Sequence, residues 1–265
     1  MAVEKFEKLD GYNILITGGS SGIGNSIARG LIDANANVFI LSRRPPNMWE
    51  CPMPEKWPSK TNWIEADFSH LHSTINCLNQ WLKHHGKELN ALIYSAVSYG
   101  SSKRRPIFET EIDEWDCVFE VGPRAYFAVC KAVLPYLLQQ ASSLIVSISS
   151  EVAYHPGPGR IDYAASKAAS RSISASIAEE FKNSNLNVLD LLPKHMVDTP
   201  GIRKRRKPDT DLSNYNSPDI FISPIVKIIQ SMGKDMNGKA FMIDRDSKVI
   251  PLNLEALPSQ TYDTK

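Results

Sequence analysis

The segment YAASK, from Tyr163 to Lys167, places a phenol and an amine four residues apart in a stretch of small, helix-compatible residues. In a helix, residues at positions i and i+4 lie on one face, one turn apart. Tyrosine and lysine do not form an ion pair at neutral pH, so this pair adds little to helix stability. A cation beside a phenol oxygen does lower the pKa of the phenol. We therefore expect Lys167 to lower the pKa of Tyr163, and Tyr163 to exchange a proton with a substrate oxygen.

A glycine-rich segment, TGGSSGIG, spans residues 17–24 between an apolar run and a helical pattern. Glycines at such a place permit a tight turn, close approach of the backbone to a phosphate, and close packing of helix on strand. The helix N-terminus that follows attracts negative charge. The segment therefore predicts a dinucleotide site, and the alternative is a structural turn without a ligand. We expect contacts from Gly18, Ser20, Ser21, Gly22, Ile23 and Gly24.

Short apolar runs alternate with longer amphipathic segments along the chain. The apolar runs are 13–17, 37–42, 91–96, 143–149, 186–192 and 240–244, and helical patterns cover 22–33, 69–85, 112–140, 163–183 and 218–232. Apolar runs with little polar alternation are typical of strands that are buried on both faces. Strand followed by helix, repeated, predicts an α/β Rossmann fold, with a doubly wound, mostly parallel sheet and helices on both faces.

The length suits one large α/β domain, so we expect residues 1–265 to form a single dinucleotide-binding and catalytic domain. Five prolines within residues 44–59 argue against a crossover helix and predict an ordered loop. The polar, basic segment 195–217 is expected to form a lid over the substrate. Residues 247–265 are expected to form a loosely attached tail.

Composition narrows the classes of partner. The chain has 30 Lys and Arg against 29 Asp and Glu, with 42% hydrophobic residues. This balance gives no reason to propose nucleic acid or an anionic membrane as a partner, so a small molecule is expected. The four cysteines are scattered without CxxC spacing, and neither a secretory segment nor a long apolar run occurs. This pattern indicates a reduced, cytoplasmic protein, and no motif predicts a metal site.

The motif TGxxxGxG, followed about 140 residues later by YxxxK, resembles the short-chain dehydrogenase/reductase family. Ser150 precedes Tyr163 by 13 positions, the separation typical of that family's catalytic serine and tyrosine. The resemblance implies that Tyr163 is the general acid or base and that Lys167 also holds the nicotinamide ribose. It implies that Ser150 hydrogen-bonds the substrate carbonyl oxygen. A carbonyl (keto) reductase or alcohol dehydrogenase, working as a homodimer or homotetramer, is the expected protein.

The end of the expected second strand, ILSRR, indicates which nicotinamide cofactor binds. Family members that prefer NAD usually carry an acidic residue there, which accepts hydrogen bonds from the ribose hydroxyls. Ser42, Arg43 and Arg44 instead offer donors and positive charge, which favours NADP(H); the alternative is that these arginines are solvated charges. By resemblance, the other residues expected to border the cofactor are Asp67, Phe68, Ser95, Ala96, Pro193, Val197 and Thr199.

The chain departs from the family pattern at several positions. Ser95 stands where the family's NNAG motif has a strand-bracing asparagine, and Lys194 replaces a glycine in the nicotinamide loop. Gly122, followed by Pro123, stands at the place of a fourth catalytic residue, an asparagine. We expect Pro123 to kink the helix there, so that a main-chain carbonyl can still hold a relay water. The alternatives are an NADP(H)-binding sensor or scaffold, or an epimerase or dehydratase acting through the same tyrosine.

The substrate pocket is expected between two segments. Residues 151–161, with Val152, Tyr154, His155 and Ile161, should form one wall, and residues 195–217 the other. The second segment contains the run RKRRK at 203–207, which has two interpretations. It is a solvated part of the lid, or its positive charge attracts a carboxylate, phosphate or carrier-protein substrate.

Overall fold

The structure is a computed structural model that describes residues 8–46, 62–100 and 103–253. Eight strands form one sheet in the order β3-β2-β1-β4-β5-β6-β7-β8, and every neighbouring pair is parallel except β7 and β8. Strand order reverses between β1 and β4, which is where doubly wound sheets bind their ligands. The strands are β1 (Asn13–Thr17), β2 (Asn37–Ser42), β3 (Trp63–Glu65), β4 (Leu89–Tyr94), β5 (Ser143–Ile148), β6 (Leu186–Pro193), β7 (Ala240–Ile243) and β8 (Val249–Pro251).

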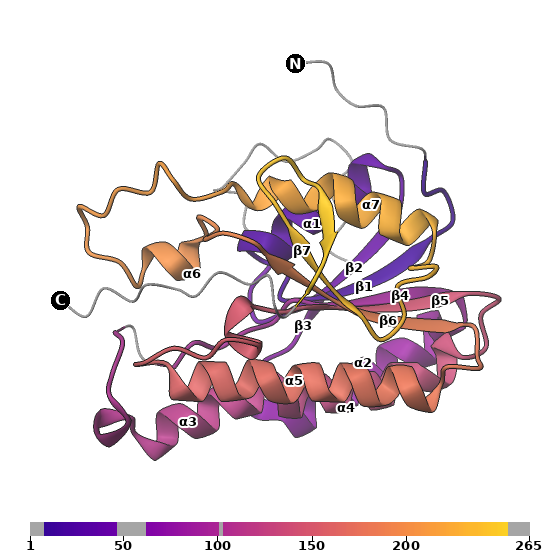
Figure 1. The fold of residues 1–265 in the computed structure, drawn as a ribbon. Coiled ribbons are helices and arrows are strands. Elements are labelled where there is room, and N and C mark those ends of the chain that lie inside the picture. The colour runs from indigo at the N-terminus through magenta and orange to yellow at the C-terminus, as the bar shows by residue number, and fades with distance from the viewer. Residues whose placement is uncertain (1–7, 47–61, 101–102, 254–265) are drawn as a thin grey trace.

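Helices cover both faces of this sheet. Helices α1 and α7 lie on one face, and α2, α4 and α5 lie on the other (Figure 1). The mostly parallel, doubly wound fold that the alternation of patterns predicts is confirmed. The helices are α1 (Gly22–Asp33), α2 (Leu71–His85), α3 (Ile112–Phe119), α4 (Ala125–Leu137), α5 (Ile161–Glu180), α6 (Pro200–Arg203) and α7 (Ile222–Gln230).

The central strands are apolar on both sides because each side packs on a helical layer. In β1, Ile14 and Ile16 are buried in the core beneath α1 and α7, whereas Leu15 is buried in the core on the other face. All three side chains are fully buried. Since successive strand residues point to opposite faces, a buried parallel strand needs apolar residues at every position.

Two expectations about the chain need correction. The helical pattern at 112–140 is broken, because a π-helical turn at Glu120–Arg124 separates α3 from α4. The tail expected from residue 247 is not loose throughout, since Val249–Pro251 pair with β7 as an antiparallel edge strand. Most of the proline-rich loop expected at 44–59 lies outside the described residues. No helix in the described parts of the chain is both long and apolar enough to span a membrane.

Candidate active site

The glycine-rich turn between β1 and α1 is held by contacts between main-chain atoms. A Cβ added at Gly18, which has φ +72°, would lie 2.7 Å from the backbone N and Cα of Ala96, after β4. A Cβ at Gly24 would lie 2.6 Å from the Gly18 carbonyl oxygen. Thr17 Oγ1 accepts hydrogen bonds from the amides of Ser95 and Ala96, at 3.2 and 3.3 Å. The turn therefore sits at the β1–β4 switch point with no room for larger residues.

This turn fits the phosphates of a dinucleotide. Gly22 has φ +60°. Ser21 is the N-cap residue of α1, but its side chain does not cap the helix, and the first turn of α1 contains no acidic residue. A helix start of this kind favours an anion, because the amide dipoles point towards it. Ser20, Ser21 and Ile23 are half-buried around the turn, as expected for residues that border a bound cofactor.

The end of β2 offers positive charge but not every donor that was expected. Arg43 and Arg44 are exposed, as a phosphate contact requires. Ser42 is buried, and its hydroxyl donates to the Arg44 carbonyl oxygen at 2.7 Å, so it shapes the loop here and is already bonded. Burial raises the pKa of Asp67, but hydrogen bonds from Ser69 and the charge of Arg43 bring the net value below the ordinary one. Asp67 is therefore an anion near Arg43.

The three expected catalytic residues lie together above the end of β5. Ser150 follows that strand, and its side chain acts to lower the pKa of Tyr163, which lies in the first turn of α5. Lys167, one turn along α5, donates from Nζ to the Ile148 carbonyl oxygen at 2.7 Å. That amine lies 6.0 Å from the centre of the Tyr163 ring. Helix α5 therefore presents the phenol and the amine on one face, as their four-residue spacing predicts.

The pKa of Tyr163 is raised, not lowered as expected, and Lys167 is not among the groups that act to lower it. Burial raises the pKa of Tyr163, and the Ser150 hydrogen bond and the charges of Arg160 and Arg205 offset this only in part. Burial also lowers the pKa of Lys167 to about 8, although the charge of Asp190 raises it. Tyr163 is 7% exposed, and desolvation of a phenolate costs more than the nearby cations return. Tyr163 is thus a protonated phenol at neutral pH.

The helix kink that Pro123 predicts is present. Gly122 has non-helical angles, φ −81° and ψ −110°, inside the π-helical turn. The Tyr94 hydroxyl, at the end of β4, donates to the Val121 carbonyl oxygen at 2.7 Å and lies 3.4 Å from that of Gly122. A Cβ at Gly122 would lie 3.4 Å from Ser166 Cβ, on α5 between Tyr163 and Lys167. Tyr94 therefore braces the kink against the catalytic helix, although the family's asparagine is missing.

Segment 195–217 starts and ends at one point. Val197 bridges Asn216, whose amide donates to the Met196 carbonyl oxygen at 2.8 Å. Between these ends the segment carries α6 and extends away from the sheet (Figure 1). Thr199 caps α6, and its side chain lies 3.3 Å from the position that a Gly22 Cβ would occupy. The segment therefore contacts the glycine turn. This contact is consistent with the expectation that Val197 and Thr199 border the cofactor.

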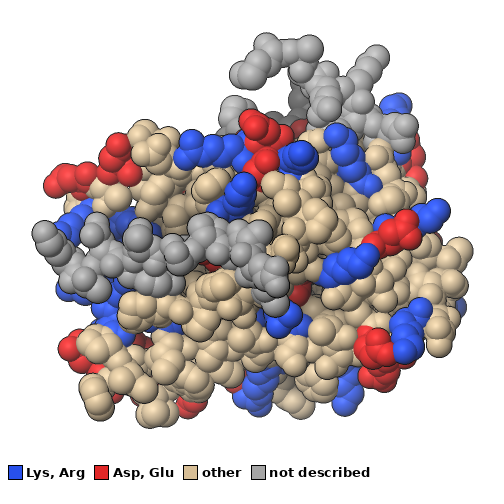
Figure 2. Space-filling model, in the orientation of Figure 1, with Lys and Arg blue, Asp and Glu red and all other residues tan. Residues whose placement is uncertain are grey.

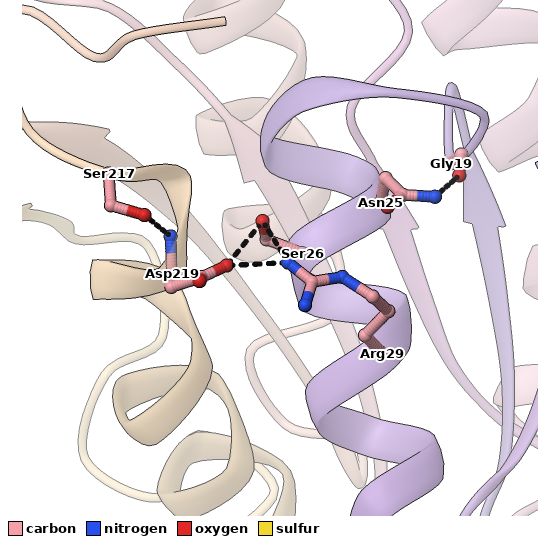
Figure 3. Close-up of polar contacts among 6 residues, drawn as sticks. All are labelled: Gly19, Asn25, Ser26, Arg29, Ser217 and Asp219. Atoms are coloured by element: carbon pink, nitrogen blue, oxygen red, sulfur yellow. Dashed lines mark hydrogen bonds and ion pairs between the residues drawn. The ribbon is translucent and has the colours of Figure 1, made fainter. Parts of the chain in front are cut away.

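Polar contacts fix the chain just after this segment to α1 (Figure 3). Asp219 Oδ1 accepts from the Ser26 hydroxyl at 2.8 Å and pairs with Arg29 at 2.7 Å. The Ser217 hydroxyl accepts from the Asp219 amide, and Asn25 Nδ2 donates to the Gly19 carbonyl oxygen within the glycine turn. The helix that follows the glycine turn thus also anchors the end of segment 195–217.

The residues expected to line the substrate pocket separate into two groups. Val152 and Ile161 line a cavity of about 520 Å³, whereas Tyr154 and His155 do not. Val152 also packs with Tyr163 and Ala164 in a small apolar cluster, so it forms the wall between the cavity and the phenol. The Tyr154 ring instead lies under Arg171, with 4.6 Å from its centre to the guanidinium carbon.

Three residues near Tyr163 were missed as site residues. The Tyr99 ring lies 5.1 Å from the Tyr163 ring, and the Arg205 guanidinium carbon lies 4.2 Å from the centre of Tyr99. Arg160 precedes α5 as its N-cap residue. Arg160 could have been identified from sequence, because it lies only three residues before the catalytic Tyr163. Nothing in the run at 203–207 distinguishes Arg205 from its neighbours.

Comparisons with known proteins agree with this geometry. A sequence model described as short chain dehydrogenase matches residues 12–210. An uncharacterized oxidoreductase of Staphylococcus epidermidis is 30% identical over 186 residues, covering 70% of this chain and 78% of the relative. A 3-oxoacyl-(acyl-carrier-protein) reductase of Thermotoga maritima is 24% identical over 245 residues, covering 89% and 98%. A Shigella flexneri short chain dehydrogenase solved with NADP has a TM-score of 0.77 at 22% identity, covering 90% and 99%.

A glycine turn at the switch point of a doubly wound sheet, with Ser150, Tyr163 and Lys167 beside it, defines a nicotinamide-dependent oxidoreductase. The chain belongs to the short-chain dehydrogenase family. The resemblance of its two motifs to that family is therefore confirmed.

Proposed function

We propose that the protein is an NADP(H)-dependent carbonyl reductase, which reduces a ketone to a secondary alcohol. The observation that carries the proposal is the placement of Tyr163 and Lys167 on one face of α5, with Ser150 at the end of β5, in a fold whose glycine turn forms a main-chain cradle for a dinucleotide. When bound, the cofactor supplies a hydride equivalent to the carbonyl carbon. One relative is named a 3-oxoacyl reductase, which supports a keto substrate.

Each catalytic residue has a separate task. Tyr163 gives its phenol proton to the carbonyl oxygen as negative charge develops there. Ser150 hydrogen-bonds the same oxygen and stabilises that charge. Lys167 is anchored on Ile148 and holds the ribose of the cofactor, the role that its family position implies. The kink at Gly122 lies beside α5, and the Gly122 carbonyl oxygen, 3.4 Å from the Tyr94 hydroxyl, has a second lone pair that can hold a relay water.

The protonation state of Tyr163 suits it to act as the proton donor of a reduction. Burial raises the pKa of this phenol, so at neutral pH it has a proton to give. An oxidation would need the phenolate as base, and that form is scarce in this environment. Within the described residues, Arg43 and Arg44 are the charges that follow β2, which supports NADP(H) over NAD(H).

An NADPH oxidation screen over ketones, with Tyr163→Phe alongside, tests the proposal. We expect turnover by the wild type, a loss of about 10³-fold in kcat for Tyr163→Phe, and NADPH affinity within about threefold. Tyr12→Phe, just before the opposite end of β1, is the matched control and should retain activity. Unchanged turnover by Tyr163→Phe would reject the mechanism.

Two alternative functions have their own signatures in this screen. Tight NADPH binding without turnover of any ketone would indicate a sensor or scaffold. A changed product without net NADPH oxidation, followed by NMR, would indicate an epimerase or a dehydratase.

We further propose that the protein works in the cytoplasm as a homodimer or homotetramer. Phe127 on α4 is 56% exposed, and Ala168 on the neighbouring helix α5 is exposed, so a second copy could cover apolar surface here. Light scattering after size exclusion should give a multiple of 29.6 kDa. Phe127→Glu should shift that mass towards one chain.

A further inference from the structure

Arg205 differs from the other cations of the run at 203–207. Arg203 makes two hydrogen bonds to Asp198, at 2.6 and 2.7 Å, and Arg206 Nε donates to the Tyr215 hydroxyl at 2.9 Å. Lys204 and Lys207 are exposed to solvent. Arg205 is half-buried, and its Nη1 is a buried donor that makes no hydrogen bond. One of the five cations therefore points inward with unused donor capacity.

Arg205 lies one aromatic ring away from the proton donor. Its guanidinium carbon is 4.2 Å from the centre of the Tyr99 ring, and that ring is 5.1 Å from the ring of Tyr163. Stacking on an aromatic face holds a guanidinium in place while its edge stays available for hydrogen bonds. Tyr99 thus positions a cation within reach of a substrate that touches Tyr163.

Arg160 approaches the same place from the start of α5. Its Nε is also a buried donor without a hydrogen-bond partner. Arg160, Arg205 and Tyr99 line one small cavity, of about 10 Å³, and Tyr99 also contacts the catalytic tyrosine. The charges of both arginines act on Tyr163, and the charge of Arg160 lowers the pKa of Arg205. Two like charges therefore face one point from different elements.

The carboxylates in the wall of this cavity have other partners. Glu114 pairs with Arg105 at 3.3 Å, and Asp162 Oδ1 accepts from the Tyr163 amide at 2.7 Å. Buried donors without partners destabilise a folded protein, and two unpaired guanidinium groups close together add repulsion. Both costs are removed by an oxyanion, which guanidinium groups bind with two parallel hydrogen bonds.

We propose that the substrate of the reductase carries a carboxylate, sulfonate or phosphoryl group close to its carbonyl, and that Arg160 and Arg205 bind this group. The assignment rests on the proposed function, and it makes the two arginines determinants of specificity. The anion is held a few bonds from the carbonyl, because only Tyr99 separates Arg205 from Tyr163.

Matched ketones test this assignment by steady-state kinetics with NADPH. The charged probes are 3-oxobutanoate, 2-oxopropanesulfonate and 2-oxopropylphosphonate, and the neutral probes are methyl 3-oxobutanoate and 2-pentanone. We expect kcat/KM at least about tenfold higher for one charged probe than for the neutral ones. Arg160→Gln and Arg205→Gln should each lower that value by about 10- to 100-fold and should lower kcat/KM of the neutral probes by a clearly smaller factor, so that the preference for the charged probe is lost. Arg205→Lys should recover part of the loss.

Lys204→Gln is the control, because it removes one positive charge from the same segment at an exposed position. It should leave the preference for charged ketones unchanged. If neutral ketones are reduced as well as charged ones, and the arginine variants do not alter the ratio, the anion subsite is wrong while the reductase function stands.

Binding without turnover separates the two proposals. Thermal unfolding is measured in acetate, methanesulfonate or inorganic phosphate against chloride at constant ionic strength, on the wild type and both glutamine variants. The subsite predicts a rise in Tm for the wild type that Arg160→Gln and Arg205→Gln abolish. If this occurs but no ketone is reduced, the anion site stands and the reductase proposal falls. If the shift in Tm relative to chloride is the same for all three proteins in every anion, the subsite is overturned.

Discussion

The glycine turn and segment 195–217 contact each other at Gly22 and Thr199, yet they are built in different ways. The glycine turn is defined mainly by main-chain atoms: Gly18 packs on the backbone of Ala96, and the amides of Ser95 and Ala96 donate to Thr17 Oγ1. Segment 195–217 is fixed at its two ends, and between them it extends away from the sheet (Figure 1). The run at 203–207 gives this part of the segment long, charged side chains. The conformation of the glycine turn is therefore fixed by its backbone contacts. In segment 195–217, by contrast, a single substitution can change the chemical groups that the segment presents.

This difference separates cofactor binding, which uses backbone groups, from substrate recognition, which uses particular side chains. A backbone cradle recognises phosphates through amides, which every sequence with small enough residues possesses. Recognition of a substrate by Arg160 and Arg205 uses side chains brought together from separate elements. Both signs of charge occur across the face shown in Figure 2, so overall charge does not reveal such a pair. Specificity here is local.

The largest expected effect is that of Gly18→Ala, which attacks the main-chain construction. The new Cβ would lie 2.7 Å from Ala96 backbone atoms, at a residue with φ +72°. Backbone cannot yield as a side chain can, so we expect the free energy of unfolding to fall by about 3 kcal/mol. NADPH affinity should fall at least about tenfold, because the turn must open. Urea unfolding and a fluorescence titration with NADPH measure both.

Gly11→Ala is the matched control for that substitution. Gly11 has φ +83°, but nothing lies within 4 Å of the position its Cβ would take. Gly11→Ala should lower the free energy of unfolding only by the conformational strain, about 1 kcal/mol, and should leave NADPH affinity unchanged. Equal effects of the two substitutions would show that conformation, and not close packing on β4, defines the turn.

Tyr94→Phe tests the junction between the two regions and should have the next largest effect. It removes the hydroxyl that donates to Val121 at the helix kink, at a buried position. We expect a loss of about 1–3 kcal/mol of stability. Because the kink faces α5 beside Tyr163, kcat should also fall about tenfold while NADPH affinity is retained.

Tyr126→Phe is the control for Tyr94→Phe. Tyr126 is fully buried, its ring lies 4.8 Å from that of Tyr94, and its hydroxyl hydrogen-bonds Ser174 at 2.9 Å. The variant should lose similar stability without a specific loss in kcat. A fall in kcat of the same size in both variants would assign the effect to general loosening of the core.

The cofactor region could be predicted from sequence because its signal is contiguous. Eight residues between a strand and a helix specify the turn, and the spacing of Ser150, Tyr163 and Lys167 follows from one strand end and one helix face. The direction of the Tyr163 pKa shift could not be predicted in the same way. It depends on burial by residues such as Tyr99 and Val152, which tertiary packing brings in.

Two other features were beyond sequence reasoning for similar reasons. Arg205 is one of five cations in a row, and only packing on Tyr99 distinguishes it. Strand β8 has three residues and no periodic pattern, and its pairing with β7 depends on the turn between them. The kink at Gly122 could be predicted because proline removes a helix hydrogen bond wherever it occurs.

Substitution of Arg43 and Arg44 sharpens the comparison, because these are the side chains with which the cofactor region could discriminate. If they bind a 2'-phosphate, replacing both by Ala should weaken NADPH binding about tenfold and leave NADH binding nearly unchanged. Lys83→Ala, near the end of α2, removes charge elsewhere and should leave the ratio of the two dissociation constants unchanged. An equal loss of affinity for both cofactors would show that the arginines attract the negative charge of either cofactor and do not discriminate NADPH from NADH.

One expected effect appears only when the pH changes, and it concerns Asp190, a buried carboxylate on β6 that accepts from the Ser174 hydroxyl at 2.9 Å. Burial raises its pKa from 3.8 to about 7, although Ser174, Ser147, Lys167 and Arg171 act to lower it. Between those two values the folded protein holds a proton that the unfolded chain has lost, so this group's contribution to stability falls as pH rises. Asp190→Asn lacks this titration. From pH 5 to 7.5, the wild type should therefore lose about 2 kcal/mol relative to the variant.

Asp198→Asn gives the opposite sign and supplies the control for Asp190→Asn. The hydrogen bond from Arg203 lowers the pKa of Asp198, so the stability that Asp198 contributes is present above pH 3.8 and is lost only as pH falls further. The difference between wild type and Asp198→Asn should therefore be flat from pH 5 to 7.5. Urea unfolding at several pH values measures both differences. A flat difference for Asp190→Asn as well would mean that Asp190 is already ionised at pH 5, held by the cations that face it from α5.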